Sequence, residues 1–274
     1  MSASSAFHAL DAKAIQRALT TTTLGRTLHV LDITASTNTL AVRMAQEDAP
    51  HGTVVVAESQ SAGRGRLGRH WYSPPGKNLY CSVLLRTPLP RERLARWLSW
   101  TPLIAALAAA RAISTVTGLS PSVKWPNDIL IGQRKVGGVL CESGDLGSAA
   151  PYVVVGMGLN VNIQAGEFPE ELREIATSLS AEAQRPFNRA VLLAAILSDL
   201  EARCDAFLAG HEADIHREYV VRCATVGRQV RVERAGADPV TGRATSIGAD
   251  GSLKIVRDDG SHLDVHAGDI IHVR

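Results

Sequence analysis

The sequence has no apolar run long enough to span a membrane and no excess of charge of either sign. Its 274 residues include 29 Lys and Arg against 27 Asp and Glu, which leaves a net charge of +2. The longest apolar stretch, residues 103–113, falls short of the roughly 18 residues that a membrane span needs, and Arg111 interrupts it. A near-neutral chain also lacks the basic excess of a general nucleic-acid binder. We therefore expect no membrane segment and only a local basic function.

Cysteine is scarce, and the four cysteines lie far apart. Cys81, Cys141, Cys204 and Cys223 form no C-x-x-C pair, so we predict neither a disulfide framework nor a zinc site. We interpret them as buried thiols in a reducing compartment. Residues 1–10 lack the basic segment and apolar core of a signal peptide. These features predict a cytoplasmic protein.

The remaining composition is typical of a folded globular protein. Apolar residues make up 45% of the chain and charged residues 20%, which suits one large domain with a small second one. Apolar periodicity and helix-start signals predict helices over residues 10–19, 36–49, 91–100 and 101–118 and from Asn188 onward. Apolar and β-branched runs predict strands over residues 27–33, 53–57, 79–85, 129–131, 136–141 and 152–161, the last broken by Gly156 and Gly158.

Roughly the last fifty residues change character. Short alternating strands separated by turns predict a small barrel-like β domain, with strands over residues 227–234, 243–247, 252–256 and 263–265. We place the domain boundary between residues 222 and 223. Residues 1–222 then form a mixed α/β domain, and residues 223–274 form the C-terminal β domain.

Residues 63–69 read Gly-Arg-Gly-Arg-Leu-Gly-Arg and follow a predicted strand. They contain G-x-G-x-x-G, which is typical of dinucleotide-binding folds when the glycines open a helix. Here the segment runs into Pro74 and Pro75, which exclude a regular helix, and no acidic residue lies about 20 positions further on. The dinucleotide interpretation therefore fails on its context.

The same loop has the chemistry of an anion cradle. Arg64, Arg66 and Arg69 concentrate positive charge, and the glycines between them let backbone N–H groups approach a phosphate closely. A disordered RNA-binding segment and a solvated surface loop are the alternatives.

Two further polar segments accompany this loop. Residues 124–128, Lys-Trp-Pro-Asn-Asp, are followed by Lys135, so two lysines flank a hairpin-like turn. Turn chemistry alone would explain the Asn and Asp there. Residues 156–162 form a glycine-broken strand, which predicts either a bulge or a floor over which a flat ligand packs.

Five segments, taken in this order, resemble those of the biotin protein ligases. They are Ser36-Thr37-Asn38, residues 60–69 with Trp71, residues 124–128, the set Arg134, Lys135, Gly138 and Leu140, and residues 156–162. The five ordered motifs are far more specific than any one of them.

The resemblance implies an α/β (α+β) catalytic domain with a mixed sheet like that of class II aminoacyl-tRNA synthetases, followed by an SH3-like C-terminal domain. It implies an ATP-dependent, AMP-forming biotin–[biotin carboxyl-carrier protein] ligase. Biotin and Mg-ATP would give biotinyl-5′-adenylate and pyrophosphate. The biotinyl group would then pass to one lysine of the biotin carboxyl carrier protein of acetyl-CoA carboxylase, with Mg²⁺ and ATP as the required cofactors.

Matching positions carry the expected site residues. Those that match the biotin site are Ser36, Thr37, Asn38, Gln60, Arg64, Gly65, Arg66, Lys135 and Gly138. Those that match the ATP and adenylate site are Arg64, Arg66, Arg69, Trp71, Asn127, Lys135 and Asn160, with Trp71 covering the adenine. The expected catalytic residues are Lys135, Arg64 and Asp128, and Asp128 is also the expected metal ligand.

Two other functions are alternatives to this one. A lipoate or octanoyl ligase shares the fold, but its pocket should lack the Ser-Thr-Asn and Gln set because lipoate has no ureido ring. A biotin-responsive transcriptional regulator would need a DNA-binding domain of more than about 50 residues, and 35 residues precede Ser36. We therefore expect a ligase without a DNA partner, acting as a monomer or weak homodimer.

Overall fold

The computed structural model describes residues 9–87, 89–147, 151–234 and 237–273. The prediction that residues 1–10 are not a signal peptide falls mostly on residues 1–8, which lie outside the described residues. The larger part of the chain is a seven-stranded sheet in the order β1-β2-β3-β7-β6-β5-β4. Its strands are β1 (Leu28–Thr34), β2 (Val54–Gln60), β3 (Leu79–Arg86), β4 (Ser122–Lys124), β5 (Asp128–Ile131), β6 (Arg134–Gly144) and β7 (Tyr152–Leu159). β1 and β2 run parallel and the other neighbours antiparallel, so the predicted mixed sheet is confirmed.

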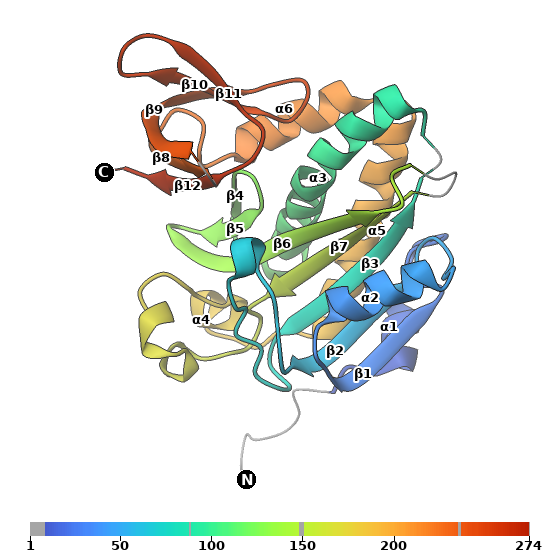
Figure 1. Cartoon of the computed structure of the whole chain (residues 1–274). Helices are drawn as coiled ribbons and strands as arrows, with labels where there is room; N and C mark the ends of the chain where they lie inside the picture. Colours follow the sequence, from blue (N-terminus) through green and yellow to red (C-terminus); the bar gives the residue numbers. More distant parts are fainter. Residues whose placement is uncertain (1–8, 88, 148–150, 235–236, 274) are drawn as a thin grey trace.

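Helices cover both faces of this sheet (Figure 1). They are α1 (Ala12–Ala18), α2 (Thr37–Gln46), α3 (Arg91–Thr117), α4 (Leu179–Ala183), α5 (Arg189–Leu208) and α6 (Glu212–Arg222). The larger core packs α3 and α5 against one face, where Val54, Val83 and Val155 point. A smaller core packs α2 against Val55 and Val154 on the other face. The alternation of strand side chains between two faces explains why these strands read as continuous apolar runs.

The two helices predicted over residues 91–118 form one continuous helix, α3, so the break at Thr101-Pro102 was wrong. Proline lacks the N–H that would bond the carbonyl of Leu98, but the side chains on both sides of it follow one apolar stripe. Trp97, Trp100 and Ile104 are all almost fully buried. Their burial outweighs the roughly 3 kcal/mol that an internal proline costs.

Helix α3 is also long and apolar enough, by composition, to cross a membrane, and it is the single such helix among the described residues. Of its most apolar window, 72% is buried inside the protein. Its apolar surface therefore packs in the core between α5 and the sheet.

Strand β7 is not broken at its glycines. Its register with β3 and β6 continues through Gly156 and Gly158 without a bulge. The glycines therefore leave space above an intact strand instead of interrupting it.

The C-terminal residues form a five-stranded antiparallel sheet in the order β11-β10-β9-β8-β12, and a small β domain was predicted here. Its strands are β8 (Gln229–Arg234), β9 (Ala237–Ile247), β10 (Leu253–Arg257), β11 (His262–Val265) and β12 (Asp269–His272). The prediction from the sequence did not include β12 and α6, because both are short and carry mixed polar residues. It also placed the start of β9 at residue 243, six residues after its actual start at Ala237. The boundary at residues 222 and 223, which falls at the end of α6, stays a prediction.

All four cysteines are free, and Cys141 is only partly buried whereas the other three are buried. Burial raises the pKa of the Cys81 and Cys141 thiols to about 12, so neither is ionised near neutral pH.

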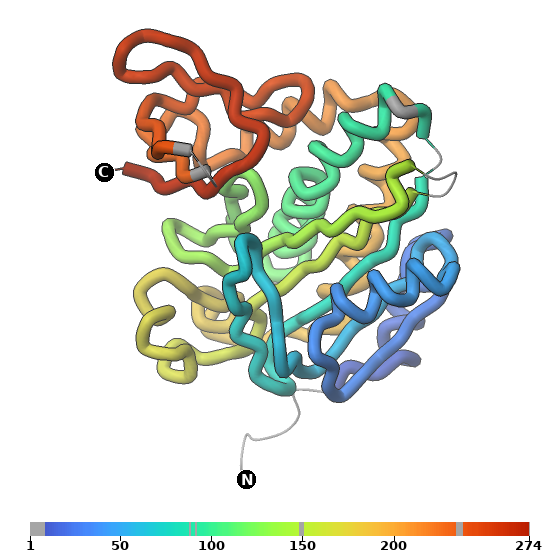
Figure 2. Tube along the Cα trace, in the orientation of Figure 1, coloured from blue at the N-terminus to red at the C-terminus, as the bar shows by residue number. Residues whose placement is uncertain are grey.

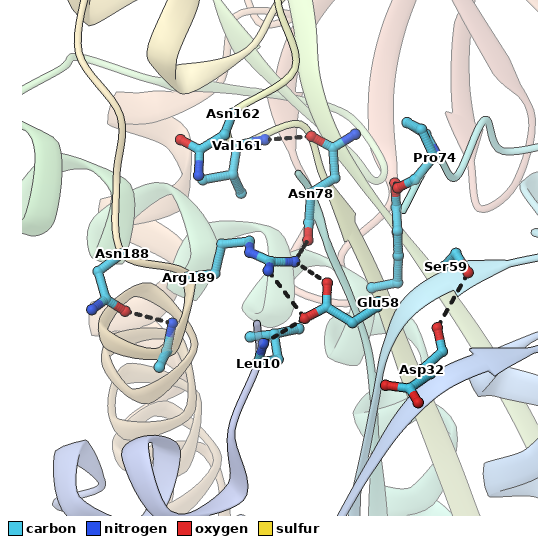
Figure 3. A network of polar contacts seen from close by, with 12 residues as sticks. Leu10, Asp32, Glu58, Ser59, Pro74, Asn78, Val161, Asn162, Asn188 and Arg189 are labelled. Carbon is cyan, nitrogen blue, oxygen red and sulfur yellow. Dashed lines mark hydrogen bonds and ion pairs between the residues drawn. The ribbon is translucent and has the colours of Figure 1, made fainter. Parts of the chain in front are cut away.

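A buried ion pair joins the start of α5 to β2 (Figure 3). The Arg189 guanidinium donates to Glu58 Oε2 at 2.6 Å and to the Asn78 carbonyl at 3.0 Å. The Leu10 N–H donates to the same carboxylate, which fastens the chain ahead of α1. The side chains of Arg189 and Glu58 are only 2% and 12% exposed.

Replacing one member of this pair leaves an uncompensated buried charge. We expect Arg189→Met to lower the free energy of unfolding by about 3–5 kcal/mol, as breaking a buried pair does. Arg217→Met is the matched control, because Arg217 and Asp214 form an exposed pair worth at most about 1 kcal/mol. Urea denaturation of both variants measures the difference, and equal losses would contradict a structural role for the buried pair.

Candidate active site

A cavity of about 760 Å³ opens on the α2 face of the large sheet. All fourteen residues predicted for the site line it: Ser36, Thr37, Asn38, Gln60, Arg64, Gly65, Arg66, Arg69, Trp71, Asn127, Asp128, Lys135, Gly138 and Asn160. The loop between β2 and β3 rises in front of β6 and β7 and reaches the C-terminal domain (Figure 2). The cavity thus lies between the sheet, this loop and β12.

One end of the cavity is a cluster of buried neutral polar groups. Ser36 caps α2, and its side chain accepts a hydrogen bond from the Thr39 N–H. The three residues of this motif are each only 4% exposed: Ser36, Thr37 and Asn38. The Thr37 N–H donates to Gln60 Oε1 at 2.8 Å, and Gln60 Nε2 donates to Ser73 Oγ at 3.1 Å. These bonds fix the orientation of the Gln60 amide at the start of the arginine–glycine loop.

Asn38 is held from two sides. Its Nδ2 donates to Glu142 Oε2 at 2.8 Å and to the Leu140 carbonyl at 3.1 Å, and its Oδ1 accepts from Ser82 Oγ at 2.6 Å. A Cβ on Gly156 would lie 1.9 Å from Asn38 Oδ1. Glycine at this position therefore admits the Asn38 side chain.

The floor of the cavity is one row of residues across four strands. The register aligns Lys124 with Asp128, Asp128 with Gly138, and Gly138 with Gly158. Directly paired residues point to the same face of a sheet. Lys124 and Asp128 therefore extend side chains into the cavity at one end of the row, and the two glycines leave the other end bare. The Trp71 ring lies on the bare end, since a Cβ on Gly158 would come within 2.6 Å of it.

Lys135 reaches over the same floor. Its Nζ lies 2.5 Å from Asp128 Oδ1 and 5.4 Å from the centre of the Trp71 ring. A Cβ on Gly138 would meet the Lys135 ammonium at 3.2 Å. The Trp71 Nε1–H is buried against this floor and has no acceptor among the described residues.

The three loop arginines have separate partners. Arg64 pairs with Glu142 at 2.6 Å. Arg66 donates to Asn127 Oδ1 at 3.0 Å and to the Gly268 carbonyl at 3.2 Å. Arg69 pairs with Asp269 of β12. The loop is therefore anchored to β6, to the β4–β5 turn and to the C-terminal domain.

The two predicted asparagines are held by backbone carbonyls. Asn127 Nδ2 donates to Val139 O at 2.9 Å, and Asn160 Nδ2 donates to Thr177 O at 3.0 Å. Both residues line the cavity, and these bonds fix the orientation of their amide groups.

Several cavity residues were not assigned from the sequence. The segment after β7 contributes an apolar wall of Phe168, Leu172 and Ile175. Glu142 and Asp269 hold the arginines, and Lys124, Arg228 and His272 line the end near the C-terminal domain. Lys124 belongs to a segment that the sequence did single out. The others lie in stretches whose sequence carries no motif.

Burial sets the protonation of two of these groups. Burial, followed by the charges of Lys124 and Arg228, lowers the pKa of His272 to about 4. Burial also lowers the pKa of Lys124, and the charges of Asp128 and Asp269 oppose this shift. His272 is therefore neutral near pH 7.

No group of three or more His, Cys, Asp or Glu side chains within the described ranges could hold a metal ion by itself. Mg²⁺ commonly binds through one or two carboxylates together with substrate phosphates and water. Asp128, whose carboxylate faces the cavity beside Asn127, fits that pattern.

The mixed sheet thus carries a neutral polar pocket next to a cluster of arginine and lysine side chains, an arrangement suited to binding a small polar molecule beside an anionic group. Comparisons with known proteins agree. The Biotin/lipoate A/B protein ligase family matches residues 30–160, and the Biotin protein ligase C terminal domain matches residues 225–273.

Individual relatives extend this match over almost the whole chain. The biotin--[acetyl-CoA-carboxylase] ligase of Mycobacterium tuberculosis is 34% identical over 250 residues, which cover 91% of this chain and 90% of the relative. The bifunctional ligase/repressor BirA of Bacillus subtilis is 33% identical over 251 residues, or 92% and 76% of the two chains. The Aquifex aeolicus biotin protein ligase, solved in complex with biotin and ATP, superimposes with a TM-score of 0.77 at 28% identity and covers 91% and 99% of the two chains. This chain belongs to the biotin protein ligase family.

The glycine beneath Asn38 gives a direct test of the polar cluster. We expect Gly156→Ala to displace Asn38 and to weaken the binding of biotin, the compound for which the family is named, by about tenfold or more, because overpacking costs about 1–3 kcal/mol. Gly166→Ala is the control, since a Cβ there meets nothing within 4 Å. Calorimetric titration with biotin measures both variants. Unchanged affinity in Gly156→Ala would show that Asn38 does not shape the pocket.

Proposed function

We infer that this protein is a biotin protein ligase that uses ATP to form biotinyl-5′-adenylate and then transfers the biotinyl group to a lysine of a carrier protein. The observation that carries this inference is the convergence of all fourteen expected residues on one cavity. We further propose that the acceptor is the biotin carboxyl carrier protein of acetyl-CoA carboxylase. The ligase named for that substrate in M. tuberculosis supports this choice.

The polar cluster suits the neutral bicyclic head of biotin. Ser36, Thr37 and Gln60 offer hydroxyl and amide groups to the ureido ring, and Asn38 supports the pocket from below. Buried polar groups discriminate strongly, because an analogue that leaves them unpaired incurs their desolvation cost. Lipoate, which has no ureido ring, would leave them unpaired.

Adenylation joins two anions, so positive charge at phosphorus is the main requirement. The biotin carboxylate oxygen bonds to the α-phosphorus, and the bond from that phosphorus to pyrophosphate breaks. We propose that the Lys135 ammonium bridges the carboxylate and the α-phosphate, because it extends over the bare floor between the polar cluster and Asp128. Arg64 and Arg66, both on the cavity wall, embrace biotin and the adenylate phosphate.

The adenosine has a matching surface on the same side of the cavity. Trp71 is the expected cover for the adenine, and Phe168, Leu172 and Ile175 supply an apolar wall. The Lys135 N–H donates to the Ile175 carbonyl at 2.8 Å, so a backbone hydrogen bond joins Lys135 to this apolar wall.

Asp128 would hold Mg²⁺ together with phosphate oxygens, and the bound ion would supply further positive charge to the phosphates. Asp128 also serves the second step. A free lysine has a pKa of about 10.4 and must lose a proton before it attacks the adenylate. We propose that the Asp128 carboxylate accepts that proton.

We propose that the protein works in the cytoplasm, as its unpaired cysteines favour a reducing compartment.

A direct assay tests the activity as a whole. The protein is mixed with biotin, ATP and Mg²⁺, and mass spectrometry detects the bound adenylate; parallel reactions replace biotin by lipoate. We expect adenylate from biotin alone. Absence of adenylate and of pyrophosphate release would overturn the proposed function, and preference for lipoate would assign the chain to the other branch of the family.

Lys135→Ala should lower the rate of adenylation by roughly 10²–10³-fold, because it removes a preorganised donor from the transition state. Single-turnover formation of biotinyl-5′-adenylate measures this rate. Arg134→Ala is the neighbouring control, since Arg134 pairs with Glu182 away from the cavity. An adenylation rate in Lys135→Ala close to that of the unmodified protein would refute the assignment.

Asp128→Asn should slow transfer more than adenylation, because the amide cannot accept the lysine proton. Transfer is measured with synthetic biotinyl-5′-adenylate and carrier protein, and adenylation with ATP. Equal losses in the two steps would contradict a role for Asp128 in accepting the lysine proton.

A further inference from the structure

Glu142 of β6 is a carboxylate to which the steps above give no part. Its Oε2 accepts from Arg64 Nη2 at 2.6 Å and from Asn38 Nδ2 at 2.8 Å. Asn38 belongs to the polar cluster and Arg64 to the arginine–glycine loop, and both line the cavity. One oxygen atom therefore joins the group that supports the biotin pocket to a group assigned to the adenylate phosphate.

The sheet fixes the place of this carboxylate. Glu142 pairs with Val154 in the uninterrupted register of β6 and β7. Residues two apart in a strand point to the same face, so Glu142 lies on the cavity face with Leu140 and Gly138. The side chains of Glu142 and Arg64 are 30% and 43% exposed. A pair at this exposure contributes little to the stability of the fold, so its value lies elsewhere.

Polar contacts continue from Asn38 back to the start of the arginine–glycine loop. Asn38 Oδ1 accepts from Ser82 Oγ at 2.6 Å, and Ser82 Oγ lies 2.9 Å from Thr37 Oγ1. The Thr37 N–H donates to Gln60 Oε1 at 2.8 Å. Because Gln60 is four positions before Arg64, these contacts form a ring that begins and ends on one loop. Side chains in one such network are energetically coupled.

The shared oxygen gives this coupling a sign. When the Arg64 guanidinium turns to a phosphate, Glu142 keeps the Asn38 amide as its partner, and that bond strengthens. A ligand that fixes Asn38 against Glu142 in turn weakens the pair with Arg64 and frees the guanidinium for a phosphate. The two effects are reciprocal, so each end of a bound adenylate favours the binding of the other.

We propose that Glu142 is a positioning residue that couples the polar cluster to Arg64, so that the biotin head and the phosphate of biotinyl-5′-adenylate bind cooperatively. This inference rests on the proposed function. Glu142 acts through Asn38 and Arg64, which it holds by one oxygen. Coupled ends retain the reactive adenylate in the cavity until the acceptor lysine arrives.

The test is a double-mutant cycle on ligand binding. The probe is the phosphodiester of biotinol with AMP, which resembles the adenylate and has no biotinyl group to transfer. Calorimetric titration gives its Kd for the unmodified protein, Asn38→Ala, Arg64→Ala and the double variant. We expect the loss of affinity in the double variant to be smaller than the product of the two single losses by about fivefold or more.

The same cycle in a Glu142→Met background removes the shared acceptor. There we expect the losses to multiply within about twofold, as for independent sites. Glu142→Gln keeps an oxygen that can accept from both partners but lacks the charge, so its coupling should lie between the other two. A purely structural role of Glu142 would change affinities without changing the coupling.

Glu182→Met is the matched control background. Its Oε1 also accepts from one arginine and one neutral side chain, Arg134 and Thr177, each at 2.6 Å, and none of these three residues lines the cavity. We expect the full coupling to persist there. Thermal unfolding checks each variant. If Glu142→Met does not fold, Glu142→Asp, whose shorter side chain cannot span both partners, takes its place.

Losses that multiply in the unmodified protein would overturn the inference, and so would a coupling that is unchanged in the Glu142→Met background. If the unmodified protein binds biotin and the phosphodiester but shows no coupling, the proposed function stands and this inference fails. If it binds neither compound, both fail.

Discussion

The structure of the site depends on a strip of sheet without side chains. Gly138, Gly156 and Gly158 are neighbours across β6 and β7, and each leaves space that another residue fills. Asn38 enters above Gly156, Trp71 lies above Gly158, and the Lys135 ammonium lies above Gly138. Because intact strands carry these glycines, the three groups converge on a rigid surface and not on a mobile loop. Any Cβ on this strip would move one of them.

The second feature is the junction between the two sheets. Arg66 bonds the Gly268 carbonyl, Arg69 pairs with Asp269, and Lys124, Arg228 and His272 line the same cavity. Part of the cavity wall therefore comes from β12 and the turn before β8. The C-terminal domain thus completes the site, and its residues contact the loop that the sequence identified as the anion cradle.

Most of the site could be predicted because its residues lie in short motifs whose order is diagnostic. The mixed α/β content and the principal strands followed from apolar patterning, as for β2 and β3, where buried residues alternate between two cores, and the mixed sheet followed from the family resemblance. Local signals were insufficient where tertiary packing decided the outcome. Pro102 predicted a helix break, but the buried tryptophans on either side keep α3 continuous.

The glycines in β7 were ambiguous in sequence because a glycine does not reveal which side chain occupies the space above it. Glu142 and Asp269 could not be predicted for a similar reason. Each acts through a partner distant in sequence, Arg64 for Glu142 and Arg69 for Asp269, and no local pattern encodes these pairings.

The carboxylates that hold the arginines have a consequence for ligand binding. Glu142 engages Arg64 and Asp269 engages Arg69, so the loop cations already have anionic neighbours from the same chain. An incoming phosphate at these arginines exchanges one anion for another and changes the local net charge little. Binding there should therefore respond to ionic strength much less than the number of basic residues around the cavity implies.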